Sequence, residues 1–284
     1  MSQHDFHIDA LMPNEMAEKA EFSGAKKAAL SWDKMFLLAI LAGAFISLGA
    51  IFATVVTAGG AGIIPFGVLK LLGGLVFCLG LVLVVVAGAE LFTGNNLIIM
   101  AWANKKITFA QVLRNWIIVY IGNFVGSVLT AIGIFLAGHY KFGSGVVGVN
   151  MLKIAEAKTS LGFVEAFMLG VFCNALVCLA VWLTLSARST TDRIVAIIFP
   201  ITAFVAAGFE HSIANMYFIS IGLLVKTFAG AKFWLMSQLT PATFENLTVT
   251  NFFSANLLPV TLGNIFGGSI MVGIIYWLIY IRKA

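Results

Sequence analysis

The chain has 284 residues, of which 61% are hydrophobic and only 10% are charged. Soluble globular domains carry about 25% charged residues, so this composition excludes a soluble fold and requires apolar surface that faces lipid. The three cysteines have no metal-like spacing, and we expect neither a metal site nor a cofactor. The net charge of +5 needs no nucleic-acid partner, because membrane topology accounts for it.

A polar arm precedes six apolar stretches. The arm, residues 1–34, lacks the apolar core of a secretory signal, and residues 13–30 are expected to form a short amphipathic helix. The apolar stretches cover residues 35–57, 67–103, 116–138, 161–185, 194–225 and 257–280. One crossing needs roughly 20 residues, so the second and fifth stretches are longer than a crossing requires. The sequence predicts an all-α integral membrane protein whose pore domain, 35–284, has six transmembrane helices, the second and fifth broken.

The distribution of basic residues predicts the orientation of these helices. With the N-terminus inside, most of the 17 lysines and arginines, including every arginine, fall in inner segments. Inner loops of membrane proteins are enriched in lysine and arginine. Both termini are therefore expected in the cytoplasm.

The same polar interruption occurs once in each half of the chain. Residues 87–95 and 207–215 both follow the pattern A-G-x-E-x-x-x-x-N inside long apolar runs. Carboxylates, histidine and amides are costly at membrane depth and are retained there for function. The repeated interruption predicts a substrate site at the interface of two repeats.

Further motif pairs fall in the same order in both halves. Residues 115–126 match 256–267 as N-x6-G-N-x2-G, and residues 36–45 match 163–172 as F-x2-A-x3-G-x-F. Each half has three crossings, an odd number, so the halves enter the membrane in opposite orientations. The sequence predicts a 3+3 inverted repeat, with repeat one at 35–138 and repeat two at 161–280.

Helix breaks leave backbone groups that need partners. Thr93 and Ser212 suit the N-caps of the second half-helices. Glu90 and Glu210 are expected to brace the breaks by accepting the unpaired N–H groups, and the alternative is a proton relay. The half-helix N-termini, with no basic side chain in a span core, favour a small and weakly held monovalent anion.

His211 is the one histidine within a span, where an ionisable residue is functional by default. Burial favours its neutral ring, which can donate a hydrogen bond to a passing anion or lend it a proton. Thr93 can donate from the sister break. Asn174 is either a pore-lining donor or part of an interhelical hydrogen bond. Phenylalanines near the breaks are expected to form constrictions that exclude hydrated ions.

Several sequence runs, including those around both breaks, resemble the bacterial formate–nitrite transporter family, and within it the formate channels. The matching runs span residues 65–67, 88–93, 115–116, 120–123, 208–216 and 259–264. The resemblance implies a homopentamer of aquaporin-like protomers, each with its own pore. It implies transport of formate, and of other small monovalent anions less well, across the bacterial inner membrane. It also links the N-terminal arm to pH-dependent gating and to pyruvate formate-lyase as a partner.

The resemblance also implies roles for individual residues. The pore positions that it assigns are His211, Thr93, Asn174, Asn215 and Lys158. The hydrophobic constriction that it implies consists of Phe77, Leu81, Leu91, Phe92, Val177 and Phe204.

Two alternatives to a formate channel are open. A proton-coupled formate or nitrite transporter would use the same residues. An integral-membrane enzyme with His211 and Glu210 as acid and base would lack a nucleophile or metal constellation, so no enzyme is expected.

Overall fold

The computed structural model describes residues 10–282, and this part of the chain is helical, without a named strand. The α-helices are α1 (Pro13–Ala28), α2 (Trp32–Thr57), α3 (Phe66–Val82), α4 (Ile99–Ala103), α5 (Phe109–Leu136), α6 (Val146–Thr159), α7 (Phe163–Ser186), α8 (Thr190–Ala206), α9 (Ser212–Phe228), α10 (Ala231–Ser237), α11 (Val249–Asn251), α12 (Leu258–Ile265) and α13 (Ile275–Tyr280). The π-helices are η1 (Leu83–Gly88), η5 (Phe252–Leu257) and η6 (Phe266–Ile274), and the 3-10 helices are η2 (Gly94–Ile98), η3 (His139–Lys141) and η4 (Pro241–Thr243).

The apolar helices agree with the predicted broken spans. Five helical segments in the described part are long and apolar enough to cross a membrane: Trp32–Thr57, Phe66–Gly88, Phe109–Leu136, Phe163–Ser186 and Val249–Tyr280. The second predicted span consists of α3 and η1, a break, and then η2 and α4. The fifth consists of α8, a break and α9, and α9 bends by 106° into α10. The all-helical fold with interruptions in the second and fifth spans is confirmed.

The arm helix is also confirmed, as α1. Pro13 occupies its first turn with Glu15, and Lys26 and Lys27 lie in its last turn. Proline at the start, acid in the first turn and bases in the last turn all favour a helix at this place. Residues 1–9 of the predicted arm lie outside the described residues.

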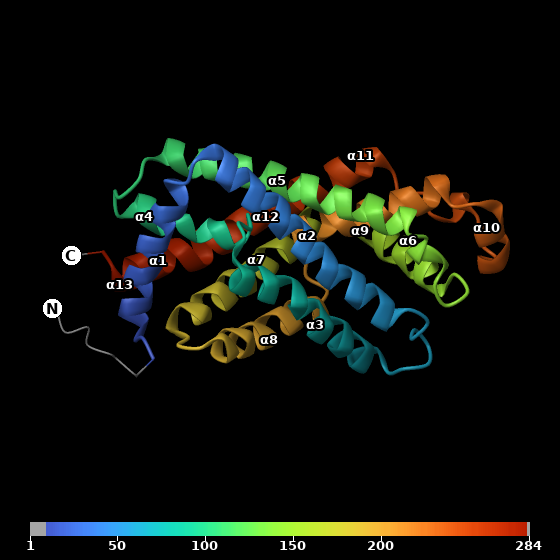
Figure 1. Ribbon diagram of the computed structural model, residues 1–284, viewed down its shortest axis with the longest axis horizontal. Coiled ribbons are helices and arrows are strands. Elements are labelled where there is room, and N and C mark those ends of the chain that lie inside the picture. Colours follow the sequence, from blue (N-terminus) through green and yellow to red (C-terminus); the bar gives the residue numbers. More distant parts are fainter. Residues whose placement is uncertain (1–9, 283–284) are drawn as a thin grey trace.

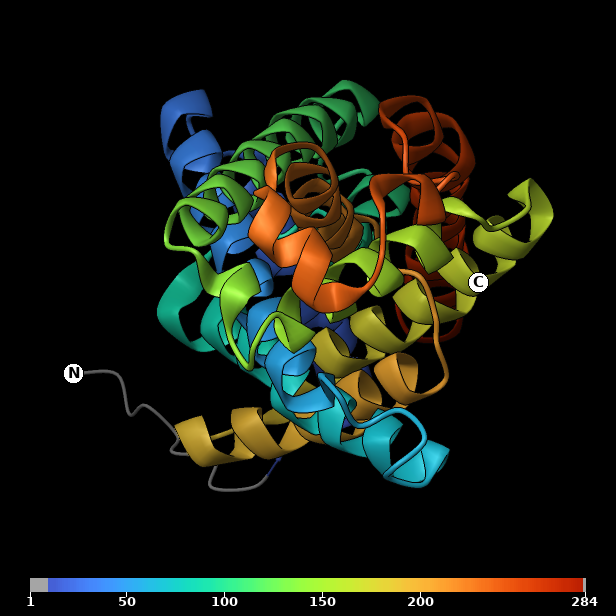
Figure 2. The same ribbon diagram turned by 90° about the vertical axis from the view of Figure 1, so that its right-hand side faces the viewer.

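The long helices run side by side between two ends of the molecule. α1 and α4 lie at one end, and α6 and α10 lie at the other (Figure 1). α2 packs on α3 and α5, α7 packs on α8 and α12, and α9 packs on α5 and α6. Seen along the bundle, these helices surround α9, and α10 lies in front (Figure 2). The sequence patterns do not predict helix α6, which lies between the third and fourth spans.

Glycines let the crossing helices approach closely. A side chain on Gly122 would collide with Ala39 of α2 and press on the Phe36 carbonyl, and one on Gly126 would collide with the Ile40 carbonyl. The matching positions of the second half, Gly263 and Gly267, lie against Phe167 and Val171 of α7. Small residues permit such backbone contact in lipid, where packing drives helix association.

These contacts correct the predicted pairing of residues 36–45 with residues 163–172. Gly122 lies on Phe36, but its counterpart Gly263 lies on Phe167 and not on Phe163. Phe36 therefore corresponds to Phe167, which lies one helical turn beyond the predicted counterpart Phe163. Aromatic and small residues recur at every turn of an apolar helix, so a short F-x2-A-x3-G pattern matches in more than one register.

A test follows from the Gly126 contact. Gly126→Ala is expected to lower the thermal stability of the assembled protein, because the new methyl group overlaps the Ile40 carbonyl. Overpacking of this kind costs about 1–3 kcal/mol. Gly133→Ala is the matched control on the same helix, since a side chain there meets nothing within 4 Å. Thermal unfolding in detergent measures both, and equal midpoints would contradict the packing argument.

Candidate functional site

Both helix breaks begin at the shared Ala-Gly pair. Gly88 ends η1 with a φ of +83°, and Gly208 follows α8 with a φ of +76°. This left-handed conformation is a common way to end a helix, and glycine adopts it without steric cost. The glycine of A-G-x-E is therefore the local cause of the break in each half.

At the first break, one asparagine from a neighbouring span holds the freed backbone. The Asn123 amide on α5 donates to the carbonyls of Ala39, at 2.8 Å, and Glu90, at 2.9 Å. Its oxygen accepts the N–H of Phe92 at 2.9 Å. Asn123 is fully buried, so it supplies the partners that lipid cannot.

Asn264 makes the same set of bonds at the second break. Its amide donates to the carbonyls of Gly170, at 2.8 Å, and Glu210, at 3.0 Å. Its oxygen accepts the N–H of Ser212 at 3.0 Å. Equivalent bonds around both breaks are what a duplicated half would produce, so they support the predicted repeat.

Glu90 holds a lysine and an asparagine. Its two oxygens accept from Lys27 Nζ of α1 and from Asn95 Nδ2, each at 2.7 Å. The Asn95 amide also donates to Asn115 Oδ1 at 3.0 Å. The prediction that Glu90 accepts the unpaired backbone N–H groups at the break is wrong, because Asn123 takes the Phe92 N–H and leaves the carboxylate for side-chain donors.

Glu210 has the corresponding partners. Lys158 Nζ of α6 and Asn215 Nδ2 donate to its two oxygens at 2.7 and 2.6 Å. Asn256 Nδ2 adds a third bond at 3.1 Å. Here, too, the carboxylate accepts from side chains and not from backbone N–H groups. The matched lysines lie in α1 and α6, outside the predicted repeat boundaries.

The predicted helix caps are corrected as well. Ser212 does not cap α9; the N-cap is His211, whose Nδ1 accepts the Ala214 N–H at 3.0 Å. Thr93 makes no side-chain cap at η2. The first break continues as a 3-10 helix of 5 residues, so only the second break starts a long α-helix. Thr93 has helical backbone angles instead of the extended ones typical of a capping residue, and its hydroxyl has a partner across the break.

That partner is His211. The distance between Thr93 Oγ1 and His211 Nε2 is 2.9 Å, and both residues are buried. Because Nδ1 accepts a backbone N–H, the neutral ring carries its proton on Nε2 and donates it to Thr93. The Thr93 hydroxyl then has its own proton available. The pair can present a hydrogen-bond donor to an anion from a site without fixed charge.

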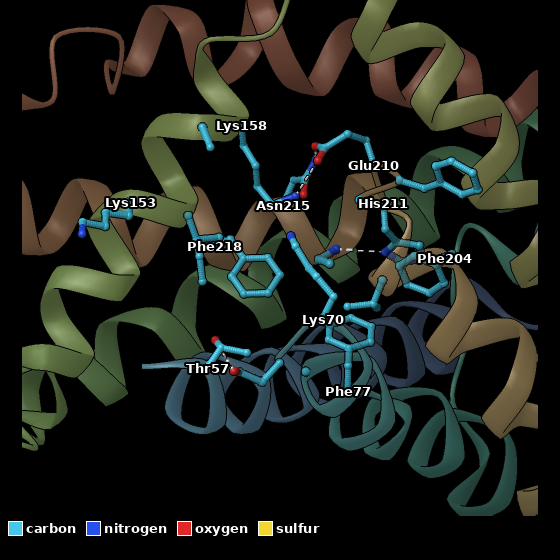
Figure 3. Close-up of a pocket in the computed structure, with 18 of the residues that line it drawn as sticks. Thr57, Lys70, Phe77, Lys153, Lys158, Phe204, Glu210, His211, Asn215 and Phe218 are labelled. Atoms are coloured by element: carbon cyan, nitrogen blue, oxygen red, sulfur yellow. Dashed lines mark hydrogen bonds and ion pairs between the residues drawn. The ribbon is translucent and has the colours of Figure 1, made fainter. Parts of the chain in front are cut away.

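A cavity of about 450 Å³ lies on one side of this pair, and we call it the α6 cavity. Its lining includes Lys158 of α6 together with Phe77, Phe204 and His211. Figure 3 shows His211 and Phe204 next to each other, with Lys158 reaching Glu210. The rings of Phe204 and His211 stack with centroids 5.8 Å apart, so aromatic surface covers the histidine.

A second cavity of about 500 Å³ lies under the arm, and we call it the α1 cavity. Lys26 and Lys27 of α1 line it, together with Leu81 and Leu91. Leu81 lies one helical turn beyond Phe77 on α3, so both cavities reach the same face of that helix. The Thr93–His211 pair therefore lies between two cavities that approach each other from opposite ends.

The predicted constriction residues divide into two groups. Phe77, Phe204, Leu81 and Leu91 line the cavities. Phe92 instead packs on Trp116 and Tyr120 of α5, with ring centroids 6.2 and 4.9 Å away, and lines a separate outer pocket. Val177 is buried, but it is not among the described residues that line either cavity.

Asn174 supports the first break. Its amide donates to the carbonyls of Asn264, at 2.7 Å, and Thr93, at 3.3 Å. These interhelical bonds match the second of the two roles predicted for it. Its oxygen has no partner among the described residues. Asn215 lines the α6 cavity and reaches Glu210, as above.

Three supporting residues are not identified by the sequence patterns. Asn123 and Asn264 belong to the Gly-Asn-x-x-Gly motif, which by itself indicates only close helix packing. Lys27 contributes to the prediction of topology alone. The shared patterns K-x-x-L at 27–30 and 158–161 and N at 115 and 256 are the signals that could identify these clusters.

The family comparison agrees with this geometry. The sequence model described as Formate/nitrite transporter matches residues 14–278. The chain is 46% identical over 279 residues to "Formate channel FocA" of Escherichia coli (strain K12), covering 98% of each protein. It is 42% identical to "Formate channel FocA" of Haemophilus influenzae, covering 93% of each.

Solved structures share the fold. A structure described as "Pentameric formate channel with formate bound" matches with a TM-score of 0.84 and 47% identity, covering 88% of this chain and 98% of that one. An "FNT family ion channel" matches with a TM-score of 0.79 and 28% identity, covering 93% of this chain and 98% of that one.

Proposed function

Because the chain belongs to the formate/nitrite transporter family, we propose that it is a formate channel that conducts formate, and less readily other small monovalent anions. The observation that carries this proposal is the buried Thr93–His211 pair between two cavities lined by lysines. The family consists of transporters and channels, and this excludes the alternative of an integral-membrane enzyme.

The route of the anion follows from the two cavities. Lysines attract formate into a cavity, where Coulomb attraction strengthens as the surroundings become less polar. The apolar side chains of Phe77, Phe204, Leu81 and Leu91 then admit it only after partial dehydration. At the centre, the hydroxyl of Thr93 donates to the carboxylate while accepting from His211. Asn174 and Asn215 hold the surrounding helices in place through their hydrogen bonds. Phe92 and Val177 are buried behind the residues that line the cavities.

The cap at His211 favours hydrogen bonding over proton donation. A protonated ring would place an N–H on Nδ1, facing the Ala214 N–H that it now accepts. The cap would have to break before His211 could hold a second proton. A neutral ring that gave up its only N–H would become an unfavourable anion. Formate therefore crosses the centre as a hydrogen-bonded anion, which supports a channel over obligate proton symport.

The assembly and its placement follow the family. We infer a homopentamer of aquaporin-like protomers in the bacterial inner membrane. Many large apolar side chains are exposed on the single chain, including Leu37, Phe163 and Phe199, and lipid or neighbouring protomers would cover them. We infer that both termini lie in the cytoplasm, because that orientation puts every arginine in an inner segment.

The arm offers a place for regulation. Helix α1 covers the α1 cavity, and Lys27 ties it to Glu90 at the first break. We propose that pH acts on conduction through movement of this arm and that the arm is where pyruvate formate-lyase binds. Co-sedimentation of that enzyme with proteoliposomes, and formate flux across a pH series, would test the two ideas separately.

Stopped-flow uptake into proteoliposomes tests the main function. Purified wild-type protein is expected to carry formate faster than nitrite or hydrosulfide, at two pH values, and to keep carrying it after the proton gradient is collapsed. Uptake that disappears with the gradient would instead favour proton-coupled transport. An intact assembly that carries no formate would refute the proposed function.

A further inference from the structure

The lining of the α6 cavity is unbalanced in charge. Three lysines contribute to its lining, Lys70, Lys153 and Lys158, and Glu210 is the one carboxylate among the described residues that line it. Lys158 and Glu210 are paired at 2.7 Å. The second carboxylate oxygen of Glu210 already accepts from two asparagines. Glu210 therefore already accepts from three side-chain donors, and none of them is Lys70.

Lys70 forms no ion pair with a carboxylate among the described residues. Within residues 10–282, the ion pairs join Lys27 to Glu90, Lys106 to Glu21 and Lys158 to Glu210. Lys70 instead lies over the Phe66 ring, whose centroid is 5.5 Å from its Nζ. A ring face attracts a cation but leaves its hydrogen-bond donors unused.

The place of Lys70 on α3 gives its depth in the cavity. Lys70, Gly73 and Phe77 follow one another at helical spacing and all line the cavity. The rise of an α-helix puts the backbone of Lys70 about 10 Å before that of Phe77 along the route. Figure 3 shows the Lys70 side chain extending into the cavity from α3, while the exposed Lys153 points away from it.

The surroundings increase the effect of this charge. Lys70 is half-buried, and the cavity wall beyond it carries the rings of Phe77, Phe204 and Phe218. Apolar walls focus the field of a charge into the cavity and raise the local concentration of counter-ions. A lysine ammonium is a point charge without the rigid fork of arginine, so it holds a carboxylate weakly enough to release it.

We propose that Lys70 forms an outer binding position for a small monovalent carboxylate, which the anion occupies before it reaches the Phe77 ring and the Thr93–His211 pair. This inference rests on the proposed formate conduction and adds a collecting site to it. Lys158, which is already paired with Glu210, lines the cavity on the inner side of this binding position. Lys153 contributes only long-range attraction at the mouth.

Saturation kinetics test this role. For Lys70→Gln, the formate concentration that gives half-maximal uptake is expected to rise about fivefold at low ionic strength, with the maximal rate retained. High salt should raise that concentration in the wild type and bring the two proteins together, because salt screens the charge. Lys70→Arg keeps the charge, so its half-maximal concentration should not exceed that of the wild type. Lys232→Gln, on the exposed surface of α10 outside the cavity, is the matched control.

A cysteine at this position separates charge from folding. Lys70→Cys can be purified as an assembled protein and then treated with a cationic or an anionic methanethiosulfonate reagent. Cys78, Cys173 and Cys178 are all buried, so the new thiol is the one that reacts. The cationic label is expected to restore the low half-maximal concentration and the anionic label to raise it further.

Two outcomes would overturn the inference without touching the proposed function. The first is a wild type that conducts formate while Lys70→Gln shows the same half-maximal concentration and salt dependence. The second is equal uptake after either label. A wild type that conducts no formate would instead refute the proposed function itself.

Discussion

Replacing His211 with phenylalanine is expected to reduce formate flux at least about tenfold while the oligomer remains assembled. The Thr93–His211 pair is the place where the anion has lost most of its water, so the hydrogen bonds there have no substitute. A hydrogen bond to a charged group contributes about 1.5–3 kcal/mol, which corresponds to a factor of ten or more in rate when it is lost at the barrier. Stopped-flow uptake into proteoliposomes measures the effect.

The variants for this experiment must separate chemistry from folding. His211 also caps α9 through its Nδ1, so phenylalanine removes a cap worth about 1 kcal/mol. His211→Asn keeps a good N-cap and is expected to assemble like the wild type with intermediate flux. His139→Phe, at the start of η3 outside both cavities, is the matched histidine control. Wild-type flux in an assembled His211→Phe protein would remove this residue from the pathway.

Replacing Asn264 with leucine is expected to have the largest effect on stability. The change keeps a similar volume but leaves three buried backbone groups without their amide partner: the carbonyls of Gly170 and Glu210 and the N–H of Ser212. Each unpaired buried group costs about 1–3 kcal/mol. The total of several kcal/mol should abolish or sharply lower the thermal transition of the assembled protein in detergent.

Asn104→Leu is the control for that measurement. Among residues 10–282, the Asn104 side chain makes a single hydrogen bond, to Glu21 at 2.7 Å, at the half-buried junction of α1 and the end of α4. Its loss should cost far less, because water can reach the groups left behind. Similar losses of stability in the two variants would show that Asn264 is not a special support of the break.

The helix break in each half of the chain is predictable from local sequence. A-G-x-E-x-x-x-x-N inside an apolar run combines a helix-ending glycine with polar residues that lipid does not tolerate. Those signals are local and compositional, so they do not depend on which helices pack together. The matching pairs Gly122/Gly263 and Asn123/Asn264 are also visible in the sequence, and in the structure both glycines pack closely on α2 and α7.

The partners of each polar group are not predictable in this way. Glu90 and Glu210 are expected to hold backbone N–H groups, but Asn123 and Asn264 arrive from distant helices and take that role. The predicted register between α2 and α7 is one turn away from the observed one, because apolar helices repeat the same residue types at every turn. Pairing depends on which helix lies opposite, and patterns within one segment do not encode that.

Local sequence is enough to predict that this chain spans a membrane, that its second and fifth spans are broken and that polar residues concentrate at the breaks. Burying polar groups in lipid carries so large a cost that their presence in an apolar run is informative on its own. The folded structure is needed to show that Thr93 meets His211, that a backbone cap directs the histidine proton toward the threonine, and that Lys70 reaches the α6 cavity without a carboxylate partner among the described residues. Those facts depend on contacts between residues far apart in the chain, which arise only when the helices pack.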